Sequence, residues 1–199
     1  MSLPPEPISL FREWAALAKR PDIAEPDAAA LATVSADGTP SVRMVLVRGA
    51  DERGFAFYTN LESKKAQDLL RPARVGAPAA LCFWWPPILK QVRVDGRATR
   101  IPDAEADAYW ATRDRGSQVG AWASRQSAEL RSGRAELEAR FAELDRSLPA
   151  KNVSRPPFWS GFRIAPERIW FWEGRAHRLH HRVLYVREGS GWVASILSP

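Results

Sequence analysis

The stretch Arg43–Lys65, RMVLVRGADERGFAFYTNLESKK, carries the strongest structural signals in the sequence. An apolar run at 44–47, with an arginine at each end, predicts a strand that is covered on both faces. A polar turn separates it from a second β-like run at 55–59, and a short helix is predicted over 63–71. The stretch therefore predicts two strands of an antiparallel sheet followed by a helix, which Asn60 or Ser63 can cap.

The charges of this stretch admit two interpretations. Lys64 and Lys65 lie in the first turn of the predicted helix, where the helix dipole disfavours a cation by roughly 0.3–1 kcal/mol. A bound phosphate would reverse that penalty, and Arg43 or Arg48 would add to the site. The alternative is a solvated helix start with arginines whose aliphatic stems are buried. Because the two arginines are five positions apart in the sequence, their side chains point to opposite faces of the strand.

Most of the remaining chain reads as short strands with sequential antiparallel pairing. Strands are predicted at 29–35, 41–48, 54–59, 79–85, 89–101, 161–164, 168–172, 182–187 and 192–196, and helices at 8–20, 63–71, 102–112 and about 126–144, with a connection at 114–120. No glycine-rich dinucleotide motif or Walker loop is present. The pattern predicts an α+β protein built on a small β-barrel, as a single domain over 1–199 with a helical insertion at about 102–145.

Composition bounds the class of partner. The formal net charge is +6 and the sequence pI is about 10.0, which favours anionic partners, either nucleic acid or phosphorylated small molecules. The arginines are scattered rather than gathered on one helix or tail, so no nucleic-acid partner is expected. No apolar run approaches the ~18 residues that would cross a bilayer, and no membrane association is expected. The lone cysteine, Cys82, excludes an internal disulfide and suits a cytoplasmic location.

All three histidines fall between 177 and 182. No metal site is expected there, because Glu173 is the only nearby carboxylate and the flanking arginines repel a cation. Two interpretations stay open: an exposed polar turn, or an anionic or aromatic ligand held by Arg178 and Arg182.

A second polar cluster lies in and after the helix predicted over 102–112. Tyr109 and Arg113 are four residues apart and share one helix face, and Ser117 begins the next turn. Such a set suits either a phosphate site or the polar end of a helix. Gln126 and Ser127 alone suggest only a helix N-terminus.

Five motifs together resemble the pyridoxine/pyridoxamine 5′-phosphate oxidase family. They are RMVLVR at 43–48, FYTNLESKK at 57–65, KQVRVDG at 90–96, AYWATRDRGSQVGAWASRQS at 108–127 and FWSGFRIAPERIWFWEGRAHRLHHR at 158–182. The resemblance runs from about Phe11 to Pro199. It implies a homodimeric, Greek-key-like antiparallel split β-barrel with peripheral helices, FMN at the subunit interface, and a C-terminal dimerisation and substrate segment at about 158–199. The implied reaction converts pyridoxamine or pyridoxine 5′-phosphate to pyridoxal 5′-phosphate, with O2 as acceptor and H2O2 as product.

The resemblance also implies roles for individual residues. The cofactor contacts would be Arg43, Met44, Val45, Leu46, Val47, Arg48, Tyr58, Thr59, Ser63, Lys64, Lys65, Gln91, Gln126 and Ser127, with Trp172 and Arg182 reaching the flavin from the partner subunit. The substrate contacts would be Arg48, Tyr109, Arg113 and Ser117 at the phosphate and Arg178, Leu179 and His180 at the pyridine ring. Arg178 and His180 would be the catalytic pair.

Four positions depart from the family pattern. Arg48 stands where the family usually has lysine, Lys64 replaces an arginine, His181 replaces an aspartate, and Ile196 replaces an arginine. A planar guanidinium fork at Arg48 changes the geometry offered to the substrate. Two alternatives therefore stay open: a family relative acting on another substrate at the same flavin site, as in phenazine biosynthesis, and a non-catalytic FMN- or pyridoxal-phosphate-binding protein.

Overall fold

The computed structural model describes residues 4–71 and 76–199. The elements in chain order are α1 (Pro7–Leu17), β1 (Ala28–Val34), β2 (Pro40–Asp51), β3 (Gly54–Asn60), α2 (Lys64–Leu70), β4 (Ala77–Trp85), η1 (Pro86–Ile88), β5 (Lys90–Arg100), α3 (Asp103–Ala111), α4 (Arg115–Ala123), α5 (Arg134–Ser147), β6 (Trp159–Glu173), η2 (Ala176–Arg178), β7 (His181–Glu188) and β8 (Gly191–Leu197).

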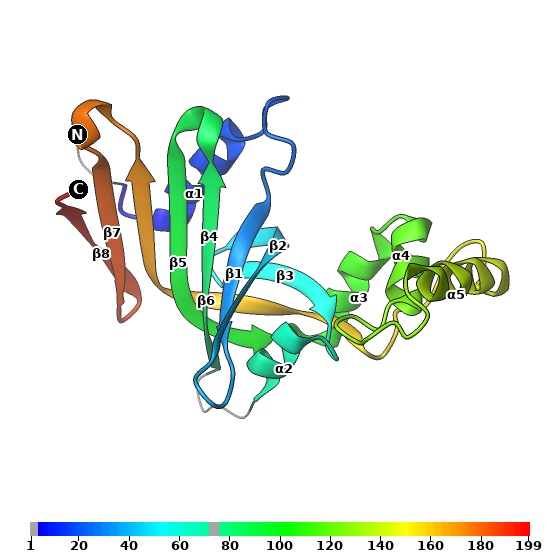
Figure 1. Cartoon of the computed structure of the whole chain (residues 1–199). Coiled ribbons are helices and arrows are strands. Elements are labelled where there is room, and N and C mark those ends of the chain that lie inside the picture. Colours follow the sequence, from blue (N-terminus) through cyan, green and yellow to red (C-terminus); the bar gives the residue numbers. More distant parts are fainter. Residues whose placement is uncertain (1–3, 72–75) are drawn as a thin grey trace.

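Six antiparallel strands close into a barrel (Figure 1). Their order is β3-β2-β1-β4-β5-β6, and a pairing of β3 with β6 joins the two ends of the sheet. The position of β4 beside β1, after the meander β1-β2-β3, is a Greek-key arrangement. The α+β barrel predicted from the sequence is therefore confirmed.

The barrel interior is filled by aromatic and branched side chains from alternate strand positions. Phe55, Phe57 and Phe83 are at most 1% exposed. Helix α1 closes one end of the barrel, where Phe11 packs edge-on against Phe55 with ring centroids 4.9 Å apart. The periodicity of two along β1, where every second residue is buried, results from this one-sided burial.

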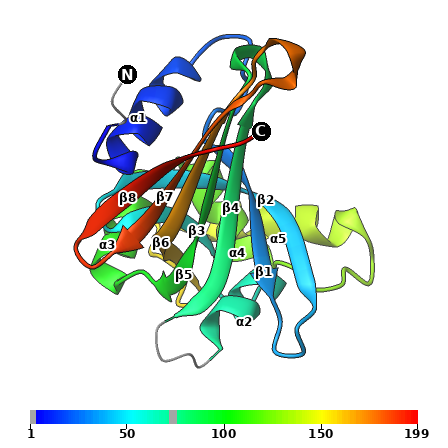
Figure 2. The ribbon, with the colours of Figure 1, turned by 90° about the vertical axis from the view of Figure 1, so that its left-hand side faces the viewer.

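Strands β7 and β8 extend the sheet beyond the barrel, next to β6 (Figure 2). Helices α3, α4 and α5 project from the opposite side and form a helical arm (Figure 1). Within the described ranges 4–71 and 76–199, the helices are too short or too polar to cross a bilayer.

Strand β2 corrects one prediction. It is covered on one face only, because its side chains alternate between exposed and partly or fully buried. Val42 and Met44 are 66% and 63% exposed in the single chain, whereas Arg43 and Val45 face inward. A continuous apolar run cannot distinguish burial inside one chain from burial against another molecule, and this explains the error. The opposite orientations predicted for Arg43 and Arg48 are confirmed.

The helical arm differs from the prediction in two places. Residues 115–123 form helix α4 rather than a connection, and the next helix begins at Arg134 rather than near Gln126. Between them, Ser127 has a positive φ of 73°, which no helix accommodates. The polar side chains of this loop bind groups on β3 and α2, and these tertiary contacts outweigh helix propensity.

Strand β6 is one long strand, where the sequence suggested two. Pro166 lies within it and pairs with Gly96, at the bulge where the β5–β6 register shifts. A proline is tolerated at such an irregularity because no regular ladder hydrogen bond is required of it. Asp95 and Gly96 therefore lie at a β-bulge in the pairing of β5 with β6. A Cβ at Gly96 would lie 2.1 Å from the carbonyl oxygen of Ala165, so this position requires glycine.

Candidate active site

A buried lysine marks the centre of a basic pocket between β3 and α2. Lys65 is 8% exposed, and its Nζ donates to two hydroxyl oxygens, Thr59 Oγ1 at 3.3 Å and Ser63 Oγ at 3.4 Å. Among the residues that the structure describes, no carboxylate forms an ion pair with it. Burial, and secondly the charge of Arg43, lower the pKa of Lys65. A buried cation without a counter-ion is the arrangement that an anionic group would complete.

Arg43 is held rigidly beside this lysine. Its Nη1 donates to Thr33 Oγ1 at 2.7 Å and to the carbonyl oxygen of Leu31 at 3.3 Å, while Nη2 donates to Ser41 Oγ at 2.7 Å. Burial lowers the pKa of Arg43. Because its direct partners are neutral oxygens, the positive charge of the guanidinium stays available to a ligand.

One buried carboxylate anchors the other side of the pocket. Asp68 accepts hydrogen bonds from Thr33 Oγ1 at 2.7 Å and from Lys64 Nζ. Burial opposes its ionisation, but these hydrogen bonds and the nearby cations outweigh burial and lower the pKa of Asp68. Thr33 thus links Arg43 to Asp68, and Ser63 caps α2 by accepting from the backbone N–H of Ala66.

The loop between α4 and α5 closes over the pocket. Thr59 Oγ1 donates to Gln126 Oε1 at 3.0 Å, and the backbone N–H of Lys64 donates to Ser127 Oγ at 3.3 Å. Both residues were predicted as cofactor contacts, and the structure places them against Thr59 and Lys64, which carry the same prediction. Residues more than 60 positions apart in the sequence therefore contact each other and complete one cluster.

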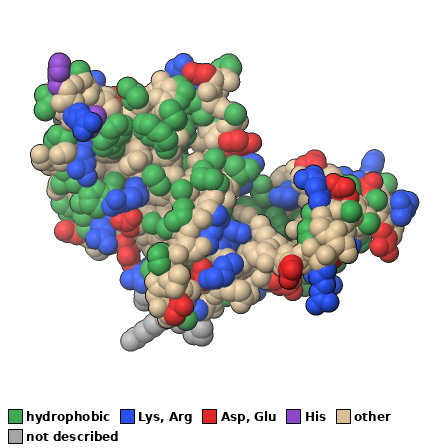
Figure 3. All heavy atoms as spheres, viewed as in Figure 1, with side chains coloured by type: hydrophobic (Ala, Val, Ile, Leu, Met, Phe, Trp, Pro, Cys, Tyr) green, Lys and Arg blue, Asp and Glu red, His purple; other side chains and the backbone are tan. Residues whose placement is uncertain are grey.

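Next to the basic pocket lies a cleft of about 190 Å³. It is lined by Met44, Val45, Leu46, Arg48, Tyr58, Thr59, Lys65, Tyr109, Arg113 and Gln126. All of these were predicted as cofactor or substrate contacts, and β2, β3, α3 and the loop after α4 bring them together. Figure 3 shows the surface hollowed between the barrel and the helical arm, with Lys and Arg side chains at the edges of the hollow.

Stacked aromatic rings form one wall of the cleft. The ring centroid of Tyr58 lies 3.9 Å from that of Tyr109 with an interplanar angle of 15°, and the ring of Trp159 is nearly parallel to both, 5.5 Å from Tyr58 and 6.1 Å from Tyr109. A Cβ at Gly161 would lie 2.8 Å from the Tyr58 ring, so glycine leaves the space for this ring. Burial, and then the charge of Glu105, raise the pKa of Tyr58.

Two arginines flank the stacked rings. Arg113 lies over Trp159, with its guanidinium carbon 5.1 Å from the ring centroid, and Nη2 donates to the backbone oxygen of Ser117 at 3.1 Å. Its Nε is buried and has no hydrogen-bond partner among residues 4–71 and 76–199. Arg48 forms an ion pair with Asp27 at 3.1 Å. Both cations line the cleft and are suited to a second anionic group.

Two further predicted contacts, Val47 and Ser117, belong neither to the cleft lining nor to the basic pocket. Val47 is buried in the barrel core, 7% exposed, and its side chain therefore cannot line the cleft. Ser117 sits in the first turn of α4, where its backbone N–H donates to the capping Asp114 at 2.8 Å. Its link to the cleft is the hydrogen bond from Arg113 to its carbonyl oxygen.

The remaining predicted residues form a second group, the C-terminal cluster, on β5, β6, η2 and β7. Gln91 pairs with Trp172 across β5 and β6, and Trp172 pairs with Arg182 across β6 and β7. These three line a separate cavity of about 270 Å³ that shares no residue with the cleft. Gln91, predicted to contact the flavin from the same subunit as Arg43, thus lies with the two residues predicted to come from the partner.

Residues 177–180 give the C-terminal cluster an unusual backbone. His177 and Arg178 have consecutive positive φ values of 57° and 62°, a conformation that costs side-chain-bearing residues free energy. His180 Nδ1 accepts from the backbone N–H of Arg175 at 3.2 Å, and its ring lies 4.6 Å from that of Trp172. A neutral His180 therefore carries its proton on Nε2. Arg178 and Leu179 are exposed.

The structure adds site residues that the motifs did not reveal. Thr33 and Asp68 hold Arg43 and Lys64, Asp27 pairs with Arg48, and Trp159 supports Tyr58. Thr33 and Asp68 are buried polar residues, a feature visible only after folding. Nothing in the local sequence of Asp27 or Trp159 signals such a contact.

Family models match both parts of the chain. The model for pyridoxamine 5′-phosphate oxidase matches residues 18–147, and the model for the pyridoxine 5′-phosphate oxidase C-terminal dimerisation region matches residues 159–199. The chain belongs to the pyridoxine/pyridoxamine 5′-phosphate oxidase family. The family and the enzyme class predicted from the five motifs are confirmed.

Curated relatives agree with this assignment over most of their length. A pyridoxine/pyridoxamine 5′-phosphate oxidase of Anaeromyxobacter dehalogenans is 55% identical over 198 residues, covering 100% of this chain and 98% of the relative. Enzymes of the same name from Rubrobacter xylanophilus and Myxococcus xanthus are each 52% identical, covering 98% and 99% of this chain and 88% and 93% of the relatives.

Solved structures support the same fold. PhzG from Burkholderia lata, crystallised with tetrahydrophenazine-1-carboxylic acid, is 34% identical, with a TM-score of 0.90 over 98% of this chain and 94% of that one. A pyridoxamine 5′-phosphate oxidase-related, FMN-binding protein from Nostoc punctiforme has a TM-score of 0.80 at 21% identity, covering both chains completely, and indicates the fold alone.

Proposed function

We propose that this chain is an FMN-dependent oxidase that converts pyridoxamine or pyridoxine 5′-phosphate to pyridoxal 5′-phosphate. The observation that carries the proposal is the pair of adjoining basic sites, one around buried Lys65 and one between Arg48 and Arg113. A flavin nucleotide and a phosphorylated substrate bring one phosphate each. The names of the relatives at 52–55% identity support the substrate class.

The basic pocket would hold the FMN phosphate. Lys65 lacks a carboxylate partner within the described residues, Arg43 is fixed by neutral oxygens, and Ser63 and Ser127 add hydroxyls. This donor set suits a phosphate, since cations and hydroxyls bind its oxygens by charge-assisted hydrogen bonds. When bound, FMN supplies a hydride acceptor for oxidation of the substrate carbon.

The cleft would bind the substrate by its phosphate. Arg48 and Arg113 provide charge, Tyr109 provides a hydroxyl, and Arg113 keeps its orientation through Ser117. Holding the phosphate at a distance from the reacting carbon fixes the orientation of the ring without contacting the atoms that change. Tyr58 and Thr59 would line the cofactor.

A second copy of the chain would complete the site. Strand β2 exposes Val42 and Met44 beside the cleft, and Leu179 and Ile196 are 70% and 66% exposed in the C-terminal region. Such exposed apolar side chains are typical of subunit interfaces. The match of 159–199 to a dimerisation region supports a homodimer. We propose that FMN lies at this interface and that Trp172, Arg182 and Gln91 reach it from the partner subunit.

Arg178 and His180 would cover the substrate ring from the same direction. Arg178 would place the positive charge of its guanidinium beside the pyridine ring and its substituents. His180, held through Nδ1, presents Nε2–H and is suited to orient the substrate amine or hydroxyl. Oxygen as the electron acceptor and a cytoplasmic setting, consistent with the single thiol, belong to the same proposal.

One experiment tests the proposal directly. The protein is purified, its visible spectrum is recorded, and pyridoxamine 5′-phosphate is added under air. We expect a yellow protein that forms equal amounts of pyridoxal phosphate and peroxide. A colourless protein that FMN cannot reconstitute would contradict the flavin assignment.

The second candidate is a phenazine-type oxidase, favoured by the structural likeness to PhzG. Tetrahydrophenazine-1-carboxylic acid, the compound crystallised with PhzG, carries a carboxylate and no phosphate. We therefore expect it to be oxidised less efficiently than pyridoxamine phosphate, because Arg48 and Arg113 would each lack a phosphate partner. Preferential oxidation of the tricyclic acid would support the alternative, and a yellow protein inactive with both would favour a non-catalytic flavoprotein.

A further inference from the structure

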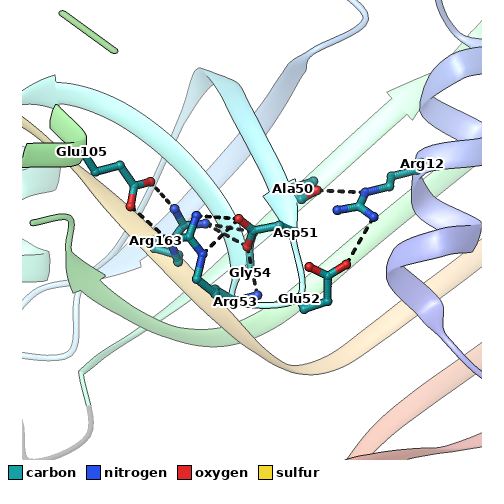
Figure 4. A network of polar contacts seen from close by, with 8 residues as sticks. All are labelled: Arg12, Ala50, Asp51, Glu52, Arg53, Gly54, Glu105 and Arg163. Carbon is teal, nitrogen blue, oxygen red and sulfur yellow. Dashed lines mark hydrogen bonds and ion pairs between the residues drawn. The ribbon is translucent and has the colours of Figure 1, made fainter. Parts of the chain in front are cut away.

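A network of four ion-paired residues lies on the outer face of the barrel (Figure 4). One of them, Glu105 on α3, lies one helical turn before Tyr109, which lines the substrate cleft. The members of the network alternate in charge: Arg53, Asp51, Arg163 and Glu105. Arg163 on β6 is the most enclosed, with a side chain 11% exposed. None of the four lines the cleft, so the network does not bind substrate.

The network joins three separate parts of the chain. Arg163 donates through Nη1 to Asp51 Oδ1 at 3.2 Å, at the end of β2, and through Nη2 to Glu105 Oε1 on α3. Arg53 donates to Asp51 Oδ2 at 2.7 Å and to Glu105 Oε2 at 3.3 Å. Both oxygens of Glu105 are therefore occupied, which fixes the carboxylate in position and orientation rather than in position alone.

The turn that carries Asp51 and Arg53 is itself anchored from the other side. Arg12 of α1 donates through Nε to the carbonyl oxygen of Ala50 at 3.1 Å and through Nη1 to Glu52 at 3.2 Å (Figure 4). The β2–β3 turn is thus held between α1 and α3. The network on α3 is attached to a fixed point of the barrel.

Helix α3 connects the ion-pair network to the substrate cleft. Glu105 and Tyr109 are four residues apart and share one face of the helix. Across β3 and β6, Ala56 pairs with Arg163 and Tyr58 pairs with Gly161, so Arg163 and Tyr58 lie on the same face of the sheet. The ion pair Glu105–Arg163 and the ring pair Tyr109–Tyr58 are consequently two successive contacts between α3 and the barrel.

We propose that Arg163 and Glu105 are positioning residues that set the docking angle of α3 and thereby place Tyr109 and Arg113 in the substrate cleft. The inference rests on the proposed function for the identity of the substrate. Helix α3 has only Ala106 and Trp110 buried, so apolar packing alone anchors it at few points. A charged clamp at its first turn adds a directional constraint that apolar contacts lack.

The test uses Glu105→Gln, which keeps the shape of the side chain and removes its charge. We expect the KM for pyridoxamine phosphate to rise about tenfold, with kcat and the Kd for FMN within about twofold of wild type. Hydrogen exchange of the α3 amides is expected to accelerate. Arg163→Met, which retains the aliphatic stem, should reproduce this pattern. If Arg163→Met folds poorly, Arg53→Met supplies a milder change, because the side chain of Arg53 is 63% exposed.

The matched control is Glu167→Gln. Glu167 also forms an ion pair with an arginine across β5 and β6, Arg97 at 3.1 Å, but it contacts no part of α3 among the described residues. This variant should leave KM and α3 exchange unchanged. An unchanged KM or unchanged α3 exchange in Glu105→Gln would overturn the inference, as would an equal loss of FMN affinity.

Failure of the proposed function is distinguishable from failure of this inference. If the wild-type chain did not oxidise pyridoxamine phosphate, the proposed function would fail. The positioning role would then be decided by α3 exchange and by the Kd for pyridoxal phosphate, measured by absorbance. In Glu105→Gln, weaker binding of pyridoxal phosphate together with faster exchange of the α3 amides would support the positioning role, and no change in either quantity would contradict it.

Discussion

The basic pocket and the C-terminal cluster are built in opposite ways. In the pocket, Lys65 is buried, and Arg43 is tied to Asp68 through a shared hydroxyl. In the cluster, Arg178 is exposed and His177 and Arg178 have strained backbone angles. A pocket whose side chains are already held in place by hydrogen bonds within one chain is prepared to bind its anionic ligand before any partner subunit arrives. An exposed, strained segment is typical of a functional site that a second molecule completes.

This difference accounts for the division of the predicted flavin contacts between two separate cavities of the single chain. Residues that the family resemblance assigns to a single flavin site line separate cavities. In the two-fold symmetric dimer proposed above, the C-terminal cluster of each subunit would meet the basic pocket of the other subunit, which would form two composite sites. Each of the following experiments tests the proposed roles of the basic pocket, the substrate cleft or the C-terminal cluster.

The largest effect is expected from mixed dimers of two inactive variants, Lys65→Met and Arg182→Met. In a heterodimer, one composite site carries both substitutions and the other carries neither. Tagged heterodimers should therefore recover about half of the wild-type activity, since one of two symmetric sites is intact. Activity no higher than that of the parents would show that both residues serve the same subunit's site.

Loss of the buried cation should abolish tight cofactor binding. We expect Lys65→Met to weaken FMN binding by about 100-fold, because a charge-assisted contact contributes about 1.5–3 kcal/mol. Titration monitored by flavin fluorescence measures the Kd. Lys19→Met, at an exposed position on the chain segment after α1, is the control and should bind FMN normally. Equal Kd values for the two variants would exclude the basic pocket as the phosphate site.

Arg178→Ala should separate turnover from cofactor binding. We expect kcat/KM to fall by about 30-fold, the loss of about 2 kcal/mol of transition-state stabilisation, while the Kd for FMN stays near wild type. Steady-state oxidation and FMN titration on the same preparation provide both values. Parallel losses in both would contradict a role at the substrate ring and favour a structural role for the turn.

The affinity for FMN should fall at alkaline pH. Burial lowers the pKa of Lys65 from its usual 10.5, and only the protonated side chain attracts phosphate. At pH values above the lowered pKa of Lys65, the affinity for FMN should decline by about tenfold per pH unit, because the Lys65 side chain must hold one proton for each FMN that binds. Lys65→Arg, which does not titrate in this range, should flatten the profile. A profile that is identical in both proteins would contradict the assignment.

The smallest effect concerns Asp27, which pairs with Arg48 at the cleft. Both side chains are partly exposed, so Asp27→Asn should change the KM for pyridoxamine phosphate by only about two- to threefold, the range of a solvent-exposed ion pair. The direction should be a decrease, because the substrate phosphate no longer meets a nearby carboxylate. Asp22→Asn, an exposed ion pair remote from the cleft, is the control. An increase in KM would show that Asp27 instead holds Arg48 in a productive position.

The sequence by itself determined the barrel and the family, and it predicted the residues of a site. Alternating patterns and turn residues at 28–60 specify hairpins, and local chemistry decides these elements. The lysines at the start of the helix predicted over 63–71 indicated an anion site as one of two interpretations that the local sequence left open, because a cation is unfavourable at that end of a helix.

Only the tertiary structure decided which predicted residues lie together. It separated Gln91 from Gln126, although both were predicted to contact FMN from one subunit. It placed Gln126 and Ser127, which were predicted to begin a helix, in a loop where they form hydrogen bonds with Thr59 and Lys64. It left Val42 and Met44 exposed on a strand expected to be covered. The physical reason is common to all three. Burial and hydrogen bonding between distant segments depend on where the chain packs, and a local pattern of residues does not contain that information.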